Sequence, residues 1–433
     1  MMEQLAIILP IIVLVAALGT GMPVAFGLVL AGVTGVAFFV GIEGGLSYLG
    51  TVLYRQSTYY SMIALPLFVL MGILAGRVGI ARKLFDAAYT LVGRLTGGLA
   101  NASIVASAMF AALSGSSVAA AAAFSPIIVS EMTRLKYDEK LSVGIVAASG
   151  TFATMIPPSI NFLFYGFITN TSVGKLFMAG ILPGILTALL YMISVIIRVK
   201  RNPALAPKPP SAFTTKEKLA TLVPTWPALI IIVVVLGGIY LGVFTPTEAA
   251  SIGALAVIIL GLASRQLSMS IFKESIVHSA KISAMCILII GGAFVFGYYL
   301  SVSGITPSVT GFIKELEVPR LVILGAILTI HIVLGTIMEN FAIMGITLPM
   351  TFPIIVGLGF DPVWFGVLVL KTCEIGLVSP PLGLNCYVVQ AATGVPLEKV
   401  FAGIFPFILV DIIVLAILVA FPQISLFIPG LMG

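Results

Sequence analysis

Long apolar runs dominate this chain and restrict it to folds that face lipid over most of their surface. A membrane helix needs about 20 apolar residues, and the uninterrupted candidate crossings are 23–40, 62–76, 175–197, 222–241, 247–263, 282–302 and 398–421. Four further runs break near their middles: 100–133 at Ser114 to Ser117, 140–168 at Pro157-Pro158, 319–357 around Gly335 to Asn340, and 361–392 at Pro380-Pro381. Backbone that leaves the helix at membrane depth is tolerated only where it packs in protein or lines a cavity. Four such breaks in one chain therefore indicate that the breaks are part of the architecture of the protein and not accidental.

The composition excludes the soluble classes of protein. Hydrophobic residues make up 60% of the 433 residues and charged residues only 9%, against roughly 25% charged residues in a typical soluble domain. A soluble enzyme, a disordered protein and a nucleic-acid-binding protein are excluded on this ground. We interpret the isolated cysteines and histidines as structural, because none has metal-ligand spacing: Cys286, Cys373, Cys386, His278 and His331.

A shift of 223 residues superimposes one half of the chain on the other. It brings together prolines, an aspartate and a short apolar motif: Pro126 with Pro349, Asp138 with Asp361, Pro157-Pro158 with Pro380-Pro381, Ala179-Gly180-Ile181 with Ala402-Gly403-Ile404, and Pro183 with Pro406. The break at Ser114 to Ser117 falls on Ile337 to Asn340. Chance does not align both double prolines and both breaks in one register. The pattern indicates an internal duplication of residues 60–200 and 282–421.

The basic residues predict the orientation in the membrane. If 100–133 is a re-entrant hairpin, one side of the membrane carries 17 of the 22 Lys and Arg residues, in the segments 77–97, 134–140, 198–218, 264–281 and 393–399. This side is predicted to be cytoplasmic, because loops rich in Lys and Arg remain inside. The second hairpin then enters from the other face. The halves are therefore predicted to be inverted repeats, a plan of secondary transporters with the binding site near the midplane.

We therefore predict an all-α polytopic membrane protein with two re-entrant hairpins and two Pro-broken helices. Met1 to Gln4 lack the basic start of a cleavable signal, so residues 5–17 are expected to begin the first membrane helix. Both termini are predicted to be periplasmic. The predicted parts are scaffold helices in 1–60, a first repeat in 61–200 (hairpin 100–133, broken helix 140–168), a cytoplasmic linker in 201–221, scaffold helices in 222–281, a second repeat in 282–421 (hairpin 319–357, broken helix 361–392) and a tail in 422–433.

The breaks carry the candidate binding groups. Ser114-Gly115-Ser116-Ser117 presents carbonyls and hydroxyls, which suit a hard cation, and a helix N-terminus at the turn suits an anion. Gly150-Thr151 and Thr154 lead into Pro157-Pro158, where proline frees the carbonyls of the preceding turn. A simple kink is the alternative for this segment, and its repetition at Ser379-Pro380-Pro381 argues against it.

Charged residues inside the predicted spans are costly and usually functional. Lys371 lies near the middle of its helix, with Glu374 three residues later on the same face. Two interpretations stay open: a structural ion pair with Glu374, or a contact between Lys371 and an anionic substrate. Glu339 and Asn340 are candidate cation ligands at the second hairpin break, and Asp411 is expected to pair with a neighbour.

The sequence carries no GxxxxGK[ST] nucleotide motif. Transport energy is therefore expected to come from an ion gradient. No arrangement of nucleophile, base and orienting group is recognisable, so we do not expect an enzyme.

Three stretches resemble a known family: Ser114-Gly115-Ser116, the stretch from Gly150-Thr151 to Ile156-Pro157-Pro158-Ser159-Ile160, and the stretch from Gly376 to Asn385, which reads GLVSPPLGLN. They resemble the large membrane subunit of TRAP transporters, the tripartite ATP-independent periplasmic transporters, over essentially the whole chain. The resemblance implies a sodium-coupled elevator in the bacterial inner membrane, with no cofactor besides the coupling ion. Its implied partners are a small four-helix membrane subunit, here expected as a separate chain, and a soluble periplasmic substrate-binding protein. The implied substrates are small organic anions such as C4-dicarboxylates, sialic acid, other sugar acids or sulfonates.

The resemblance also implies where ions and substrate bind. Sodium is expected beside Ser114, Ser116, Gly150 and Thr154 in one half and beside Gly335, Cys373, Gly376 and Ser379 in the other, with Glu339 as a further ligand. Substrate is expected between the sodium sites, near Ser117, Thr151, Pro157, Lys371, Pro380 and Asn385. Two segments depart from the family pattern, which has Asp in the second hairpin and Asn before its proline break: here they read Met338-Glu339-Asn340 and Lys371-Thr372-Cys373-Glu374.

Two alternatives remain from the sequence. One is a self-sufficient sodium–anion symporter with a similar hairpin architecture. The other is a membrane scaffold that transports nothing, although continuous helices would suffice for that role. The internal repeat and the four breaks favour a transporter.

Overall fold

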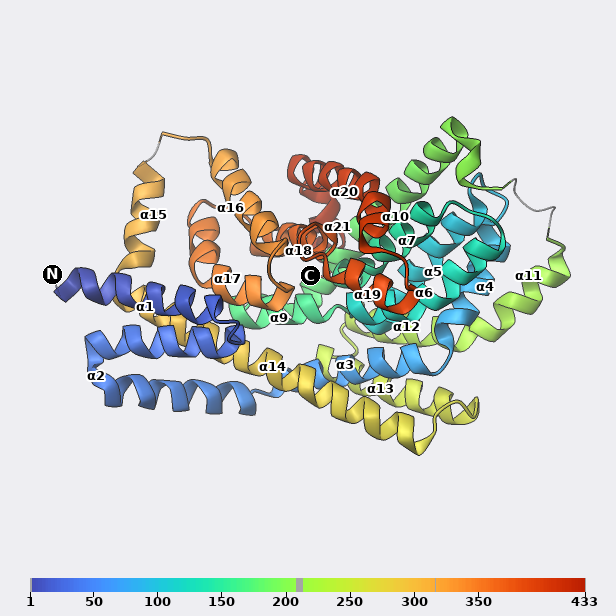
Figure 1. The fold of residues 1–433 in the computed structure, drawn as a ribbon. Helices are drawn as coiled ribbons and strands as arrows, with labels where there is room; N and C mark the ends of the chain where they lie inside the picture. The colour runs from blue at the N-terminus through green and yellow to red at the C-terminus, as the bar shows by residue number, and fades with distance from the viewer. Residues whose placement is uncertain (1, 208–212, 316, 433) are drawn as a thin grey trace.

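The computed structural model describes residues 2–207, 213–315 and 317–432 (Figure 1). Within these ranges the chain forms 21 α-helices and no β-strand. Eight helices, or nine if the bent pair α7/α8 and α9 counts as one span, are long and apolar enough to cross a membrane. The predicted all-α, multi-span class is confirmed.

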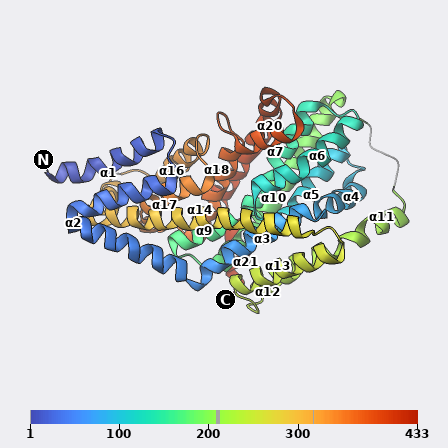
Figure 2. The same ribbon diagram turned by 60° about the horizontal axis from the view of Figure 1, so that its bottom comes forward.

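One group of helices runs along the length of the molecule (Figures 1 and 2). It contains α1 (Met2–Gly19), α2 (Val24–Thr58), α3 (Ala64–Arg77), α12 (Trp226–Tyr240), α13 (Pro246–Ala263) and α14 (Met269–Val302). The 34-residue α14 packs first on α3, through Ser279, and then along α2, as at Gly292. The expected helix 23–40 ends where Gly41, with φ 79°, turns the chain back, and residues 42–58 add a second helical arm that the sequence analysis did not anticipate.

The two aligned halves contain corresponding elements, with α7 and α8 of the first half together matching α18 of the second. The first consists of α5 (Gly98–Ser114), α6 (Ser117–Arg134), α7 (Glu139–Gly150), α8 (Phe152–Met155), α9 (Ile160–Thr169) and α10 (Val173–Arg201). The second consists of α16 (Arg320–Gly335), α17 (Asn340–Gly357), α18 (Pro362–Val378), α19 (Leu384–Thr393) and α20 (Leu397–Ala420). The segments predicted as hairpins are α5 with α6 and α16 with α17, and those predicted as broken helices are α7 to α9 and α18 with α19.

The aligned residues have matching local roles. Asp138 caps α7 by accepting a hydrogen bond from the Leu141 amide at 2.8 Å. Its counterpart Asp361 caps α18 through the amides of Val363 and Trp364. The peptide bonds inside Pro157-Pro158 and Pro380-Pro381 are both cis.

The packing between the halves is reciprocal. Helix α7 packs on α20 while α18 packs on α10, and α6 packs on α19 while α17 packs on α9. A contact made by the first half with the second is therefore repeated by the second half with the first.

Several segments expected as loops or tails contain helices: α4 (Ile80–Val92), α11 (Thr215–Leu222), α15 (Ile305–Glu315) and α21 (Gln423–Gly430), with short 3-10 turns at Tyr60–Ile63, Pro203–Leu205 and Val223–Thr225. Helix α14 also begins at Met269, inside the expected loop 264–281. These helices are missed by a search for apolar runs because they are short or amphipathic. In α4, for example, Leu84 and Phe85 are buried while Arg82 is exposed. The shift of 223 places α4 on α15, each between an apolar helix and a hairpin.

The segments predicted to be cytoplasmic contact one another. Arg77 pairs with Glu274 at 2.9 Å, and the hydroxyls of Thr90 and Thr221 lie 2.8 Å apart. The Asp138 amide donates to the Leu205 carbonyl at 3.0 Å. Lys399 pairs with Glu139, which joins the fifth segment, 393–399, to the same set. This grouping agrees with one common side.

The topology is tested by cysteine labelling in a chain whose three native cysteines are replaced by alanine. An impermeant maleimide is expected to label Ser308→Cys in intact spheroplasts and Ala204→Cys only after permeabilisation, since both residues are exposed and the basic side is predicted to be inside. Labelling of Ala204→Cys from outside would reverse the orientation.

Candidate functional site

The tip of the first hairpin is a two-residue turn. Helix α5 ends at Ser114 and is followed by Gly115, whose φ of 58° is left-handed, and Ser116 caps α6 by accepting from the Ala119 amide at 3.4 Å. A Cβ on Gly115 would lie 2.6 Å from the Pro158 carbonyl oxygen. The Gly115 carbonyl accepts from the Ile160 amide at 3.3 Å. The tip is therefore fixed against the break in the first broken helix.

The tip of the second hairpin is fixed in a similar way. The Thr336 carbonyl accepts a hydrogen bond from the Leu382 amide at 2.9 Å. Gly335 packs directly on Gly376 of α18, where a Cβ on Gly376 would lie 2.6 Å from the Gly335 Cα. Each hairpin tip thus contacts the break of its own half.

Each tip also contacts the broken helix of the other half. The Asn385 side chain, on α19, donates to the Ser117 hydroxyl at 2.7 Å and to the Ala147 carbonyl at 3.2 Å. The Asn340 amide group donates to the Asn161 side-chain carbonyl at 3.4 Å. Ser117 and Asn340 are 223 residues apart and Asn161 and Asn385 are 224 apart, so these bonds form a reciprocal pair to within one residue.

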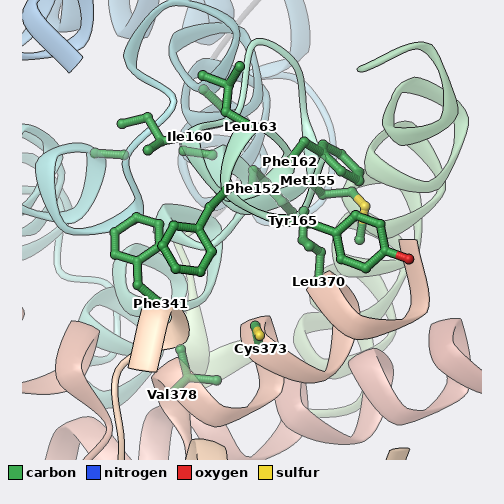
Figure 3. Packing of buried hydrophobic residues seen from close by; sticks show 14 of the residues in the cluster. Phe152, Met155, Ile160, Phe162, Leu163, Tyr165, Phe341, Leu370, Cys373 and Val378 are labelled. Carbon is green, nitrogen blue, oxygen red and sulfur yellow. The ribbon is translucent and has the colours of Figure 1, made fainter. Parts of the chain in front are cut away.

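Apolar side chains of neighbouring helices pack against the breaks. Figure 3 shows side chains of α8 and α9 meeting Phe341 of α17 and Leu370, Cys373 and Val378 of α18. The rings of Phe164 and Phe341 lie 4.9 Å apart. Close packing resists shifts of the backbone, so the broken segments are held in one arrangement.

A cavity of about 280 Å³ lies between the two tips and the helices α3 and α14. The first residues of four helices line it: Ser117 of α6, Ile160 of α9, Asn340 of α17 and Leu384 of α19. The N-terminus of a helix carries a partial positive charge and free N–H groups. Four of them bordering one space make it attractive to an anion without any basic side chain.

Some of the residues predicted from the sequence line this cavity and others surround it. Ser116, Ser117 and Glu339 are in the lining. Ser114, Gly150, Thr151, Thr154, Pro157, Gly335, Cys373, Gly376, Ser379 and Asn385 are buried in or beside the tips and breaks, and Pro380 is exposed at the second break. Gly150 adjoins Asn385, because a Cβ on Gly150 would lie 3.2 Å from its amide nitrogen.

Buried oxygens without a hydrogen-bond partner occur at this site. Among the described residues they include Ser114 Oγ, Thr154 Oγ1 and Asn385 Oδ1. A buried polar atom without a partner is unfavourable, and oxygen atoms are the ligands that hard cations prefer. Ser114 and Thr154 are two of the residues predicted to hold sodium, and their hydroxyls fit that role.

Lys371 lies outside the cavity lining, in a buried ionic cluster. Its ammonium group donates to Glu374 at 2.7 Å, to Asp411 at 2.6 Å and to the Thr187 hydroxyl at 3.3 Å. The Tyr191 hydroxyl donates to the other oxygen of Asp411 at 2.7 Å. The ion pair with Glu374, one of the two interpretations that the sequence leaves open, is present, and Asp411 is a second carboxylate partner. The cluster links α10, α18 and α20.

Sequence reasoning missed several residues that line the cavity, including Asn161, His278 and Phe341. Asn161 directly follows the first residue of α9. A search for polar residues at helix starts immediately after each break would have found it. His278 and the apolar lining residues of α3 and α14 carry no such signal.

Comparison with known proteins gives consistent results. Residues 11–424 match the family model of the tripartite ATP-independent periplasmic transporter, DctM component. The chain is 37% identical to the C4-dicarboxylate TRAP transporter large permease protein DctM of Pseudomonas aeruginosa, over 88% of this chain and 89% of the relative. It is 32% identical to the sialic acid TRAP transporter large permease protein SiaM of Vibrio cholerae, over 95% of each. Among solved structures, the fold is similar to that of the Alcanivorax borkumensis YdaH transporter, with a TM-score of 0.61, 14% identity, and coverage of 88% and 89% of the two chains.

Proposed function

The chain belongs to the DctM-component family of tripartite ATP-independent periplasmic (TRAP) transporters, and from this premise we propose that it is the sodium-coupled transport subunit of a binding-protein-dependent importer of small organic anions. The relatives are transporter permease subunits and not enzymes. The observation that best supports an anionic substrate is that the N-termini of four helices border one cavity.

The proposed sodium sites are formed by the hairpin tips and the breaks. Ser114 and Thr154 supply buried hydroxyl oxygens in the first half, and Gly335, Cys373, Gly376 and Ser379 lie at the corresponding place in the second. Glu339 offers a carboxylate at the second tip. Sodium bound beside the cavity adds positive charge next to the anion site. Anion and cation then favour each other's binding, which is the physical basis of coupled transport.

We propose that the two halves are inverted repeats and that the body they form moves as an elevator. The reciprocal contacts of Ser117 with Asn385 and of Asn340 with Asn161 support the repeat. The cavity supports the motion, because one wall comes from the tips and breaks and the other from α3 and α14. Helices α4 and α15 connect the apolar helices α3 and α14 to the two hairpins and are the proposed arms of this motion.

The proposed partners are a small four-helix membrane subunit and a soluble periplasmic binding protein, and the proposed location is the bacterial inner membrane. C4-dicarboxylates and sialic acid, for which two relatives are named, set the range of substrates to test.

Uptake into proteoliposomes tests this function. Vesicles contain the chain with its small subunit, the binding protein is added outside, and a panel of labelled organic anions is offered. We expect uptake under an inward sodium gradient and none under a matched potassium gradient, because no nucleotide motif supplies another energy source. Equal uptake in both gradients would contradict sodium coupling. Full uptake without the binding protein and small subunit would instead identify a self-sufficient symporter.

Thr154→Val tests the sodium site. Valine has nearly the same shape and removes the unpartnered hydroxyl. We expect the sodium concentration for half-maximal uptake to rise about tenfold, which corresponds to the loss of one ligand worth about 1.4 kcal/mol. Thr329→Val, at an exposed position on α16, is the control and is expected to behave as wild type. An unchanged sodium dependence in Thr154→Val would remove Thr154 from the proposed site.

A further inference from the structure

The cavity between the tips has two unlike walls. The hairpin tips and helix starts form the more polar wall, with Ser116, Ser117, Asn161 and Asn340 beside apolar residues such as Val118 and Phe341. The facing wall, from α3 and α14, is apolar except for His278: it contains Val69, Ile73, Ile282 and Met285. A ligand in this space therefore meets hydrogen-bond donors at one end and hydrocarbon along the rest.

The polar wall has donors for one anionic group. Asn161 accepts from Asn340 through its carbonyl, which leaves its own NH2 group as a donor for a ligand. Ser117 accepts from Asn385, which leaves its hydroxyl proton to donate. The four helix starts also border the cavity, and their partial positive charge favours an anion. A single carboxylate fits this set.

The apolar wall offers nothing comparable to a second anionic group. Among the described residues that line the cavity none is Lys or Arg, and the ionisable ones are Glu339 and His278. Glu339 repels an anion as a carboxylate and offers it no donor when it binds sodium. A buried charge without a partner is strongly unfavourable. His278, on α14, is the one lining side chain on that side that would have to donate a hydrogen bond to a second carboxylate.

We propose that the substrate is a small monoanion, with one carboxylate at the helix starts and an apolar body against α3 and α14, and not a dicarboxylate. This inference rests on the proposed function, because it assigns a substrate class to the same site. The cavity volume of about 280 Å³ is at the lower end of the range for small-molecule sites, which agrees with a compact ligand.

Two compounds of equal size provide the test. 4-Methylpentanoate and succinate have the same number of non-hydrogen atoms and differ in an isopropyl group in place of one carboxylate. Binding is measured as the ligand-dependent shift in unfolding temperature of the full chain in detergent, in sodium and in potassium buffer. We expect 4-methylpentanoate to bind about tenfold more tightly than succinate, since burial of two methyl groups changes affinity by about that factor. The preference is expected only in sodium, which excludes partition of the acid into detergent.

A charge placed on the apolar wall should reverse the preference. Met285→Lys is expected to weaken 4-methylpentanoate binding and to strengthen succinate binding about tenfold. Val277→Lys, at an exposed position on the same helix outside the cavity lining, is the control and should leave both affinities unchanged. No change in Met285→Lys would show that the ligand does not reach this wall and would overturn the proposal.

The remaining outcomes distinguish failure of the monoanion class from failure of anion transport. Sodium-dependent binding of succinate as tight as that of 4-methylpentanoate would overturn the monoanion class while leaving anion transport intact. Loss of that succinate binding in His278→Leu would then assign the second carboxylate to His278. If neither compound binds in sodium and no anion of the panel is taken up by proteoliposomes, the proposed function fails as well.

Discussion

Replacing Lys371 with methionine is expected to abolish accumulation of folded chain in the membrane. The ammonium group is fully buried and pairs with two carboxylates, Glu374 and Asp411, whose side chains are also fully buried. Removing one partner from a buried ionic cluster leaves uncompensated charge and costs about 3–5 kcal/mol. That is a large share of the stability of an ordinary domain, about 5–15 kcal/mol. The yield of monodisperse protein in size-exclusion chromatography measures the effect.

Neutralising the carboxylates should restore folding in steps. In Lys371→Met/Glu374→Gln, Asp411 keeps its charge with only the Tyr191 hydroxyl as a partner, so we expect partial recovery. Adding Asp411→Asn removes the last charge, and we expect most of the yield to return. Lys175→Met, at an exposed position on α10, is the control and should fold normally. Full recovery in the double variant would show that Asp411 does not depend on Lys371.

The triple variant also tests the predicted role of Lys371 in substrate binding. If Lys371 contacts the substrate during transport, the triple variant folds but takes up nothing. If the lysine only joins α10, α18 and α20, uptake returns with an apparent affinity near that of wild type. The second result would remove Lys371 from the predicted substrate site.

Gly335→Ala is expected to abolish sodium-dependent uptake. The new methyl carbon would lie 2.9 Å from the Gly376 Cα, a contact with backbone that cannot rotate away. Overpacking of this kind costs about 1–3 kcal/mol and displaces the backbone. The carbonyls of the second tip and break would move with it, and these are the groups proposed to hold sodium. Uptake and unfolding temperature are measured together.

Gly325→Ala is the matched control on the same helix. A Cβ at Gly325 meets nothing within 4 Å, and alanine favours the helix by about 0.5–1 kcal/mol over glycine. We therefore expect unchanged uptake and a slightly higher unfolding temperature. Normal uptake by Gly335→Ala would show that the close contact of α16 with α18 is not needed for function.

The local elements of this fold are predictable because their signals are local. An apolar run, a Pro-Pro pair and a Ser-Gly-Ser turn each act within a few residues, so the hairpins and broken helices can be read from the sequence. The aligned aspartates Asp138 and Asp361 are helix caps for the same reason.

The contacts between the halves are not predictable in this way. That Asn385 meets Ser117 across 268 positions depends on how the halves pack, and no spacing encodes it. The same holds for Asp411, which lies 40 positions from Lys371, and for the apolar wall from α3 and α14. The sequence therefore predicts the parts of the site, while the lining of the cavity requires the structure.

The four helix starts at the cavity affect how substrate specificity can change during evolution. Their attraction for an anion resides in peptide groups, which every residue except proline supplies, and not in the identity of any side chain. Exchange of one apolar side chain for another at lining positions such as Ile73 or Met285 alters which ligand body fits and leaves the attraction for an anion in place. During evolution, the transported substrate can therefore change without an intermediate protein that transports nothing.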